Sequence, residues 1–257
     1  MRLEKLTKEE KELLLPGESV EALSAKVKVI TSKTHTFGTD TFILADFSIP
    51  KKHEIAVEIG TGCGTIPLYW LSLGAEVKKI FAIDIQKKAC YQLERSAEIS
   101  GVSDKFEVIC ADVKKEIPQI TPHSCDLVVC NPPYKAVGGG LVNSESDIRI
   151  ARHEYECSID DVTRCAAKLL NFWGRLCLCH RVERLCDVIE SMKKSGIEPK
   201  KLRFVQQRKS SAPKLFLVEG KNGALPGLIA LPTLLIEDDC GNLSDEMVQI
   251  YRYYGEK

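Results

Sequence analysis

Short apolar runs alternate with amphipathic helical stretches through the middle of the chain, and this alternation restricts the fold more than any other feature. Strands are expected at the apolar runs and helices between them. In chain order, the sequence predicts strands at 55–59, 79–83, 106–110 and 127–130, with helices at 65–73 and 87–100. Strands that alternate with helices form parallel sheets covered by helices. We therefore expect an α/β fold with helices on both faces of the sheet.

The same pattern continues in the second half of the chain. It predicts helices at 160–170 and 183–194 and strands at 175–179, 202–206 and 215–219. The last two strands are close enough in sequence to form a hairpin, which would add one antiparallel strand. We expect a Rossmann-like, seven-stranded and mostly parallel sheet in a single domain over residues 1–257, with residues 1–53 as an N-terminal extension. The pattern gives no role to residues 220–257.

Composition narrows the class of protein. The chain has 257 residues and 44% apolar content, enough for the core of one large domain or two small ones. Lysine plus arginine and aspartate plus glutamate number 36 each, so a polyanion would have to bind a local patch. The N-terminus is charged, and no run reaches about 18 apolar residues. We expect a soluble, cytoplasmic protein with no membrane segment.

Eleven cysteines are an odd number, and most of them stand in apolar runs. They are expected to be buried, reduced thiols. Cys177 and Cys179 fall on one face of a predicted strand, just before His180. Because no second ligand pair follows at the spacing of a zinc finger, we predict no metal site.

A glycine-rich turn follows the first predicted strand. Glu58 precedes three glycines at alternate positions, Gly60, Gly62 and Gly64. Glycines permit a tight turn and the close approach of a ligand to the backbone. Dinucleotide folds instead carry the spacing G-x-G-x-x-G. The turn therefore favours a cofactor without a pyrophosphate.

Acidic residues end the next two strands. Asp84 is followed by Ile85, and Asp112 is followed by Val113. A carboxylate at the second strand end can accept hydrogen bonds from both ribose hydroxyls, and one at the third can reach an adenine amino group. Each acid alone could cap a helix or face water. Together with Glu58 they stand at three successive strand ends, where open α/β sheets bind ligands. We therefore predict a site for S-adenosylmethionine.

The tetrapeptide Asn131-Pro132-Pro133-Tyr134 follows the fourth strand. Its prolines cannot donate N–H groups or continue a helix, so the loop is stiff. The Asn131 side-chain oxygen and the Pro132 carbonyl can accept both hydrogens of an aromatic amino group, and Tyr134 can stack on the ring. A plain proline-rich turn is the alternative. Beside a cofactor site, the tetrapeptide predicts methyl transfer to an amino nitrogen.

These motifs resemble those of the class I S-adenosylmethionine-dependent methyltransferases that modify amino groups. Four segments further resemble the bacterial family that methylates adenine N6 in the anticodon loop of a valine tRNA: residues 37–40, 58–64, 131–134 and 150–154. The resemblance covers most of residues 30–220.

The resemblance implies two groups of site residues. The catalytic residues would be Asn131, Pro132, Pro133 and Tyr134, with Tyr134 stacked on a flipped base. The cofactor would contact Phe37, Asp40, Glu58, Gly60, Gly62, Gly64, Asp84, Ile85, Asp112, Val113 and Asn131. Of these, the glycines would hold the methionine part, Asp84 the ribose and Asp112 the adenine. Phe37 and Asp40 would close over the cofactor, so the N-terminal extension would contribute to the cofactor and substrate face.

Local charge suggests where tRNA would bind. Arg208 and Lys209 lie on the loop that leaves the sixth strand, at the same sheet edge as the tetrapeptide, where phosphates would pass. Arg152 and His153 could contact a bent RNA or could pair with nearby glutamates. Four lysines at the opposite edge are expected to be solvated: Lys193, Lys194, Lys200 and Lys201.

Other functions remain open. Glutamine N5 methyltransferases of peptide release factors share the tetrapeptide but tend to carry a helical N-terminal domain, which about 50 residues can scarcely form. Guanine N2 methylation of ribosomal RNA is compatible with the aromatic residue after the prolines. Adenine-specific DNA methyltransferases usually need a larger target-recognition region. A non-catalytic cofactor- or RNA-binding module would not need the Asn131 and Pro132 acceptors for an amino group. The sequence leaves open a monomer or a homodimer.

Overall fold

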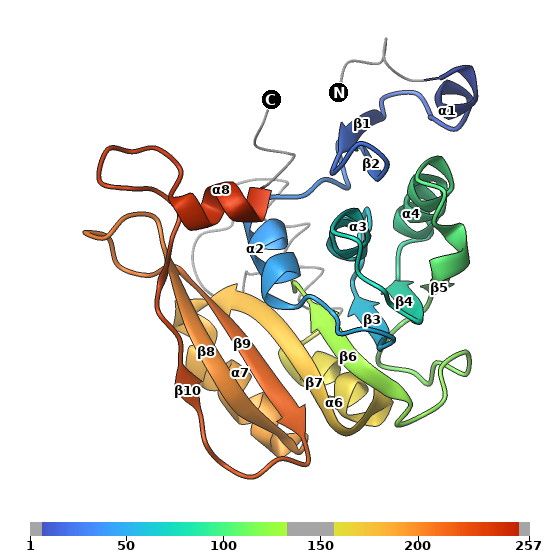
Figure 1. Ribbon diagram of the computed structural model, residues 1–257. Helices are drawn as coiled ribbons and strands as arrows, with labels where there is room; N and C mark the ends of the chain where they lie inside the picture. Colours follow the sequence, from blue (N-terminus) through green and yellow to red (C-terminus); the bar gives the residue numbers. More distant parts are fainter. Residues whose placement is uncertain (1–6, 133–156, 252–257) are drawn as a thin grey trace, which may run out of the picture.

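The computed structural model describes residues 7–132 and 157–251 and is built on one large mixed sheet (Figure 1). The strand order is β10-β8-β9-β7-β6-β3-β4-β5, and β11 also pairs with β8. The long strands are β3 (Ile55–Ile59), β4 (Lys79–Asp84), β5 (Phe106–Cys110), β6 (Cys125–Cys130), β7 (Leu170–Arg181), β8 (Ile197–Gln206) and β9 (Leu215–Asn222). Only β9 runs antiparallel to its neighbours among these strands. The predicted Rossmann-like fold with one antiparallel strand is confirmed. The sheet has nine strands in the described residues, where the sequence predicted seven, because the short β10 and β11 also pair with β8.

Strands β7, β8 and β9 are each at least three residues longer than the sequence predicted, and β7 and β8 differ most. The first residues of β7 include the exposed Phe172 and Trp173, and its pairing with β6 shifts in register between Cys125 and Leu127. This irregular start interrupts the alternation that predicts a strand. In β8, charged residues such as Lys200 and Lys201 stand at half-buried positions. A strand near the edge of a sheet tolerates such residues, so the apolar pattern marks only its second half.

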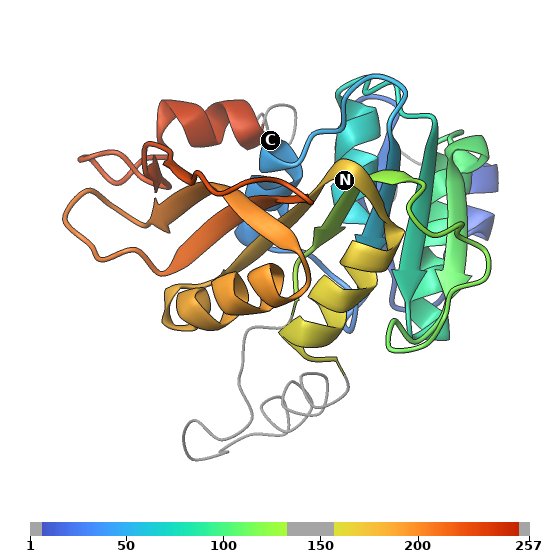
Figure 2. The same cartoon turned by 90° about the horizontal axis from the view of Figure 1, so that it is seen from below.

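Helices cover both faces of the sheet (Figure 2). One face packs against α2 (Thr39–Phe47), α3 (Thr65–Ser72), α4 (Lys87–Ile99) and α8 (Asp245–Tyr251). The other packs against α6 (Ile159–Leu169) and α7 (Leu185–Lys194). Short 3-10 turns stand at η2 (Ser103–Lys105) and η3 (Val182–Arg184). Along β7, Cys177 and Cys179 face the α2 layer, whereas Leu176 and Leu178 face the α6 layer. The two cysteines therefore share one face, as predicted.

The cysteines are all free thiols, but they are not all buried. Cys110, Cys186 and Cys240 are exposed, and Cys157 is half-buried. The expectation of buried thiols holds for those in strands and helix interfaces, such as Cys177. It is wrong for the three exposed ones, because they stand at a strand end, on the outer side of α7 and in a loop.

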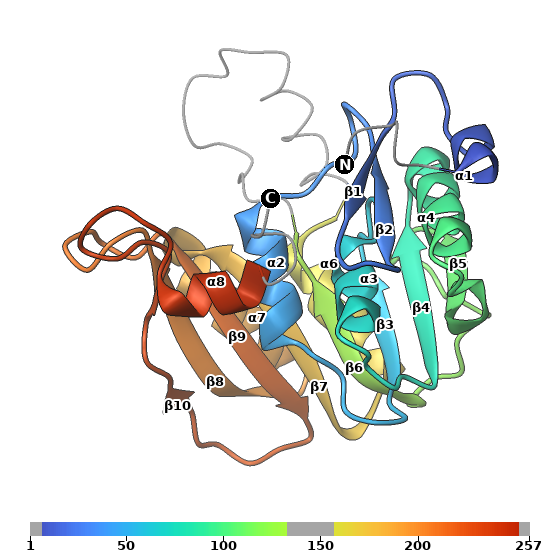
Figure 3. The same cartoon turned by 45° about the horizontal axis from the view of Figure 1, so that its top comes forward.

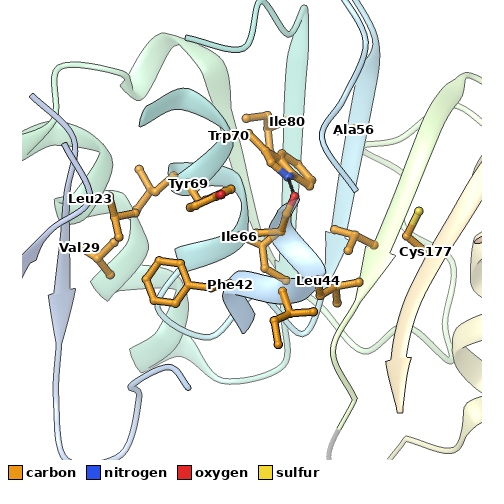
Figure 4. Packing of buried hydrophobic residues seen from close by; sticks show 14 of the residues in the cluster. Leu23, Val29, Phe42, Leu44, Ala56, Ile66, Tyr69, Trp70, Ile80 and Cys177 are labelled. Atoms are coloured by element: carbon orange, nitrogen blue, oxygen red, sulfur yellow. Dashed lines mark hydrogen bonds between the residues drawn. The ribbon is translucent and has the colours of Figure 1, made fainter. Parts of the chain in front are cut away.

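Helix α2 lies at the centre of its layer. Four consecutive residues from Phe42 to Ala45 are buried, because α3, α8 and β7 surround the helix. Figure 4 shows Phe42, Leu44, Ile66 and Trp70 together in this core. Trp70 is fully buried, and its indole Nε1 donates a hydrogen bond of 2.9 Å to the Ala45 carbonyl oxygen. This packing fixes α2 over the sheet.

The N-terminal extension folds against α4. It contains α1 (Lys8–Glu12) and a hairpin of β1 (Ser19–Ala22) and β2 (Lys28–Thr31), which lies beside α3 and α4 in Figure 3. The Arg95 guanidinium donates to both Glu18 carboxylate oxygens at 2.5 and 2.7 Å, and their side chains are 5% and 8% exposed. Separating such a buried pair is strongly unfavourable. This pair attaches the N-terminal extension to α4.

Residues 223–251, part of the segment for which the sequence predicted no role, cover the outer side of β8. Two-residue strands, β10 (Ile229–Ala230) and β11 (Leu234–Leu235), pair in parallel with it. Helix α8 follows and reaches α2, where the Tyr251 hydroxyl and Thr39 Oγ1 share a hydrogen bond of 2.7 Å. The segment therefore protects an edge strand and supports α2.

No helix within residues 7–132 and 157–251 is long and apolar enough to cross a membrane.

Candidate active site

A pocket of about 410 Å³ lies at the carboxyl edge of the sheet. Because β3, β4, β5 and β6 run parallel, their carboxyl ends meet there. The predicted site residues in its wall are Gly60, Gly62, Asp84, Ile85, Asp112, Val113, Asn131 and Pro132. Four others stand outside the wall: Phe37, Asp40, Glu58 and Gly64. Pro133, Tyr134, Arg152 and His153 lie outside the described residues.

The glycine turn after β3 adopts a left-handed backbone. Gly62 and Gly64 have φ of 54° and 77°, values that L side chains rarely adopt. The Gly62 amide donates a hydrogen bond of 2.9 Å to Asp84 Oδ2, and the Gly60 amide donates one of 2.8 Å to the Ile83 carbonyl oxygen. Gly64 precedes α3, and a Cβ atom there would overlap the Leu93 side chain. The turn is thus held by β4 on one side and by α4 on the other.

Asp84 is held rigidly at the end of β4. Its Oδ2 accepts from the Gly62 amide and its Oδ1 accepts from the Gln86 amide at 2.8 Å, and the residue is 7% exposed. Each carboxylate oxygen has a second lone pair, so both can also accept from a diol. Asp112 is more exposed, and its Oδ1 accepts from the Lys114 amide at 3.0 Å. Both carboxylates therefore stand as acceptors along one wall of the pocket, and their roles at the ribose and the adenine stay predictions.

Glu58 lies beneath the turn rather than in the pocket wall. It is 3% exposed, and the Thr61 hydroxyl donates a hydrogen bond to its Oε2. Burial raises the pKa of Glu58 well above its ordinary value, the Thr61 hydrogen bond opposes this rise, and the nearby charge of Asp84 adds to it. The geometry therefore gives Glu58 a part in supporting the turn.

We expect Glu58→Gln to remove a pH dependence of stability. Since the folded-state pKa exceeds the ordinary value of 4.5, folding favours the protonated acid. The contribution of Glu58 to folding stability is complete below pH 4.5. It is lost as the pH rises toward the folded-state pKa, by up to about 1.4 kcal/mol per pH unit. Urea unfolding at a series of pH values should show the stability of the wild type falling relative to the variant. The exposed Glu98→Gln is the control. Parallel pH profiles for all three proteins would contradict this.

Asn131 lies directly after β6 and contacts a residue far away in sequence. Its Nδ2 donates a hydrogen bond of 3.1 Å to Oδ2 of Asp40, in the first turn of α2. A carboxylate only accepts hydrogen bonds, so the amide nitrogen must face Asp40. The Asn131 side chain therefore presents its oxygen on the opposite side, as an acceptor. This is the orientation that a clamp for an amino group needs.

Phe37 and Asp40, predicted to close over the cofactor, both stand outside the pocket wall. The Phe37 ring packs edge-on against Phe42 with centroids 5.3 Å apart. Asp40 contacts Asn131 and lines a second groove. Closure over the cofactor stays a prediction for both residues.

Residues Thr34 to Thr36 form a pocket wall that the sequence analysis missed. The Gln92 side-chain amide donates to the His35 carbonyl oxygen at 3.2 Å, and His35 Nε2 lies 3.3 Å from Gln86 Oε1. These contacts fix the segment at the pocket. Its position just before the Phe37–Asp40 motif was the only signal in the sequence.

The predicted RNA contacts Arg208 and Lys209 lie on the loop after β8. Because β8 runs parallel to β6, this loop and Asn131 share one edge of the sheet, as predicted. Arg208 Nε donates to Glu237 Oε2 at 2.5 Å, so its charge is paired.

Of the four lysines expected to be solvated, Lys201 departs from the expectation. Its Nζ lies 3.1 Å from Oε1 of Glu219, a residue that is 5% exposed. A buried carboxylate needs such a partner. Lys194 is exposed and pairs with Glu190 at 2.7 Å, and Lys200 Nζ donates to the Leu225 carbonyl oxygen at 3.1 Å.

Comparison with known proteins supports both the fold and the resemblance. The sequence model of a family described as RNA cap guanine-N2 methyltransferase matches residues 54–173. A protein of Tolumonas auensis named tRNA1(Val) (adenine(37)-N6)-methyltransferase is 28% identical over 181 residues, 70% of this chain and 74% of that protein. A protein of Parabacteroides distasonis with the same name is 26% identical over 182 residues, 71% of this chain and 75% of that protein.

Solved structures show the same fold. A predicted O-methyltransferase from Agrobacterium tumefaciens superposes with a TM-score of 0.66 at 16% identity, over 82% of this chain and 95% of that one. A SAM-dependent methyltransferase from Aquifex aeolicus gives 0.51 at 15% identity, over 71% and 88%. The chain therefore has the Rossmann-like fold of the S-adenosylmethionine-dependent methyltransferases, and it is a sequence relative of the proteins named tRNA1(Val) (adenine(37)-N6)-methyltransferase, as its motifs indicated.

Proposed function

We propose that this protein transfers a methyl group from S-adenosylmethionine to the exocyclic N6 of an adenine in tRNA. The observation that carries the proposal is the Asn131 amide, oriented by Asp40 and placed in the same pocket as the glycine turn and Asp84. An acceptor that is fixed beside a nucleoside site is what methylation of an amino group requires.

The chain's own residues supply positioning. The lone pair of the adenine amino nitrogen is delocalised into the ring, which makes it a poor nucleophile. Acceptors at the Asn131 oxygen and the Pro132 carbonyl hold both hydrogens and favour a pyramidal nitrogen, and Tyr134 stacks on the base. The bound cofactor supplies an electrophilic methyl group on a positively charged sulfur. Because the methyl group would pass directly from this sulfur to the amino nitrogen, with the displaced proton passing to water, the main task of Asn131, Pro132 and Tyr134 would be to align the nitrogen with it.

The cofactor fits the residues around the pocket. Asp84 offers two fixed oxygens for the ribose hydroxyls, and Asp112 stands one strand further on for the adenine amino group. The turn from Gly60 to Gly64 brings backbone close to the methionine part. Ile85 and Val113 give the pocket apolar surface for the adenine ring.

The substrate is an RNA. The names of both relatives specify adenine 37 of tRNA1(Val), which supports the anticodon loop of a valine tRNA as the target. In this proposal phosphates pass over Arg208 and Lys209, and Arg152 and His153 contact the backbone of a bent strand. Catalysis takes place in the cytoplasm, where tRNA is modified.

Guanine N2 is the second candidate target. The family model that matches residues 54–173 is described as RNA cap guanine-N2 methyltransferase. The N2 group of guanine is also an aromatic amine, so the Asn131 and Pro132 acceptors suit it equally.

The proposed function is tested by transfer of labelled methyl groups followed by nucleoside mass spectrometry. The acceptors are unmodified tRNA1(Val), total tRNA, capped RNA, ribosomal RNA and a peptide release factor. N6-methyladenosine in tRNA is the expected product. N2-methylguanosine would favour the second candidate, label in the release factor would favour glutamine methylation, and cofactor binding without transfer to any acceptor would favour a non-catalytic module.

A further inference from the structure

A second groove, of about 580 Å³, lies beside the candidate active site. Its walls come from the start of α2, the end of β7 and the β8–β9 connection. Val205, Leu215 and Ile236 provide apolar surface in it. Asp40 also lines this groove while it accepts the hydrogen bond from Asn131. One side chain therefore connects the two sites.

Two exposed cations stand together at this groove. Arg181 pairs in the sheet with Leu215, and the Val182 amide donates to the Lys214 carbonyl oxygen at 3.2 Å, so Arg181 and Lys214 are neighbours. Neither has an ion-pair partner among the residues that the structure describes. Arg184, Arg203 and Arg208, in contrast, each form an ion pair with a carboxylate. Arg181 and Lys214 are thus available to an anion.

The strand register sets the separation between the two sites. Cys130 of β6 pairs with Leu178 of β7. Asn131 follows Cys130 by one residue, and Arg181 follows Leu178 by three, which offsets Arg181 by two residues or roughly 7 Å along the strand direction. Because β7 lies beside β6, Arg181 is also displaced by one strand spacing of roughly 4.8 Å, so the two positions lie roughly 8–9 Å apart. The groove is therefore close enough to the Asn131 and Pro132 acceptors to hold a neighbouring nucleotide.

We propose that the groove binds the nucleotide adjacent to the methylated base, with its phosphate on Arg181 and Lys214 and its base on the apolar surface. The proposal rests on the proposed function, because it requires an RNA substrate. Glu183 and Gln207 also line the groove. Glu183 provides an acceptor for the edge of that base, and Gln207, whose Nε2 donates one hydrogen bond to Glu237 Oε1, has a second N–H to donate. Sites for single-stranded nucleotides usually combine cations that contact the backbone with aromatic side chains on which bases stack. In this groove the cations are Arg181 and Lys214, and the aliphatic side chains of Val205, Leu215 and Ile236 provide the surface for the base.

The test uses the full chain and a fluorescent, unmodified anticodon stem-loop of tRNA1(Val). Dissociation constants are measured by anisotropy over a range of salt concentrations for the wild type, Arg181→Gln and Lys214→Gln. The matched control is Lys193→Gln, which removes an exposed positive charge at the opposite edge of the sheet. We expect each groove variant to bind about tenfold more weakly and to lower the salt slope by about 0.7 to 0.9 for the lost phosphate contact. The control should match the wild type.

Steady-state methylation separates this inference from the proposed function. Arg181→Gln and Lys214→Gln should raise KM for the stem-loop while kcat and the dissociation constant for S-adenosylmethionine stay near those of the wild type. If the wild type methylates tRNA and both groove variants behave like Lys193→Gln, the groove proposal is overturned and the proposed function stands. If the wild type methylates only a protein, both the groove proposal and the proposed function are overturned. Thermal unfolding of each variant verifies folding.

Discussion

Asn131→Ala is expected to lower the rate of methyl transfer by at least about 100- to 1000-fold, the range seen when one preorganised polar contact to a transition state is removed. The alanine lacks the oxygen that, in the proposed function, holds the target amine and aligns its nitrogen lone pair. The hydrogen bonds that hold the glycine turn and Asp84, where we propose that the cofactor binds, do not involve this side chain. Calorimetric titration with S-adenosylmethionine should therefore give an affinity close to that of the wild type, while turnover with tRNA is almost lost.

Variants of Asp40 test the same role of Asn131 through smaller decreases in kcat. Asp40→Ala removes the acceptor that orients the Asn131 amide, so the kcat should fall, but less than in Asn131→Ala. Asp40→Asn keeps an acceptor oxygen and should recover part of the rate. The exposed Asn242→Ala is the surface control. If Asn131→Ala loses cofactor affinity and turnover in equal measure, its side chain is structural rather than catalytic.

Gly64→Ala is expected to destabilise the fold by about 2–4 kcal/mol, which combines a strained left-handed residue with overpacking. Gly64 has φ of 77°, and a Cβ atom there overlaps Leu93 of α4. The added methyl group must force Leu93 away from the start of α3 or distort the turn. Urea denaturation measures the loss of unfolding free energy.

Gly74→Ala is a closely matched control for that experiment. Gly74 has φ of 78°, and a Cβ atom there would meet no atom within 4 Å. Gly74→Ala should therefore lose only about 1 kcal/mol of unfolding free energy, the cost of a left-handed backbone at alanine. Combining Gly64→Ala with Leu93→Ala relieves the overlap, so the double variant should lose less than the sum of the single losses. Equal losses in Gly64→Ala and Gly74→Ala would rule out a role for the Leu93 contact.

The parts of the fold that depend on local patterns were predicted from the sequence. Apolar runs located the strands, and turn glycines and strand-end acids such as Asp84 identified most of the pocket wall, because parallel strands bring their carboxyl ends together. The contact of Asp40 with Asn131 could not be predicted in this way, since it joins residues 91 positions apart through the packing of α2. Arg181 and Lys214 became neighbours only through the register of β7 and β9.

The last described helix has a consequence for how the protein is made. Tyr251 of α8 shares a hydrogen bond with Thr39, which precedes Asp40 in the first turn of α2. A ribosome completes the strands around the cofactor pocket long before it synthesises α8. A nascent or prematurely terminated chain without α8 is therefore expected to bind S-adenosylmethionine while the Asn131 amide is poorly anchored. Catalytic competence would then be acquired only after α8 has been synthesised and has packed against α2.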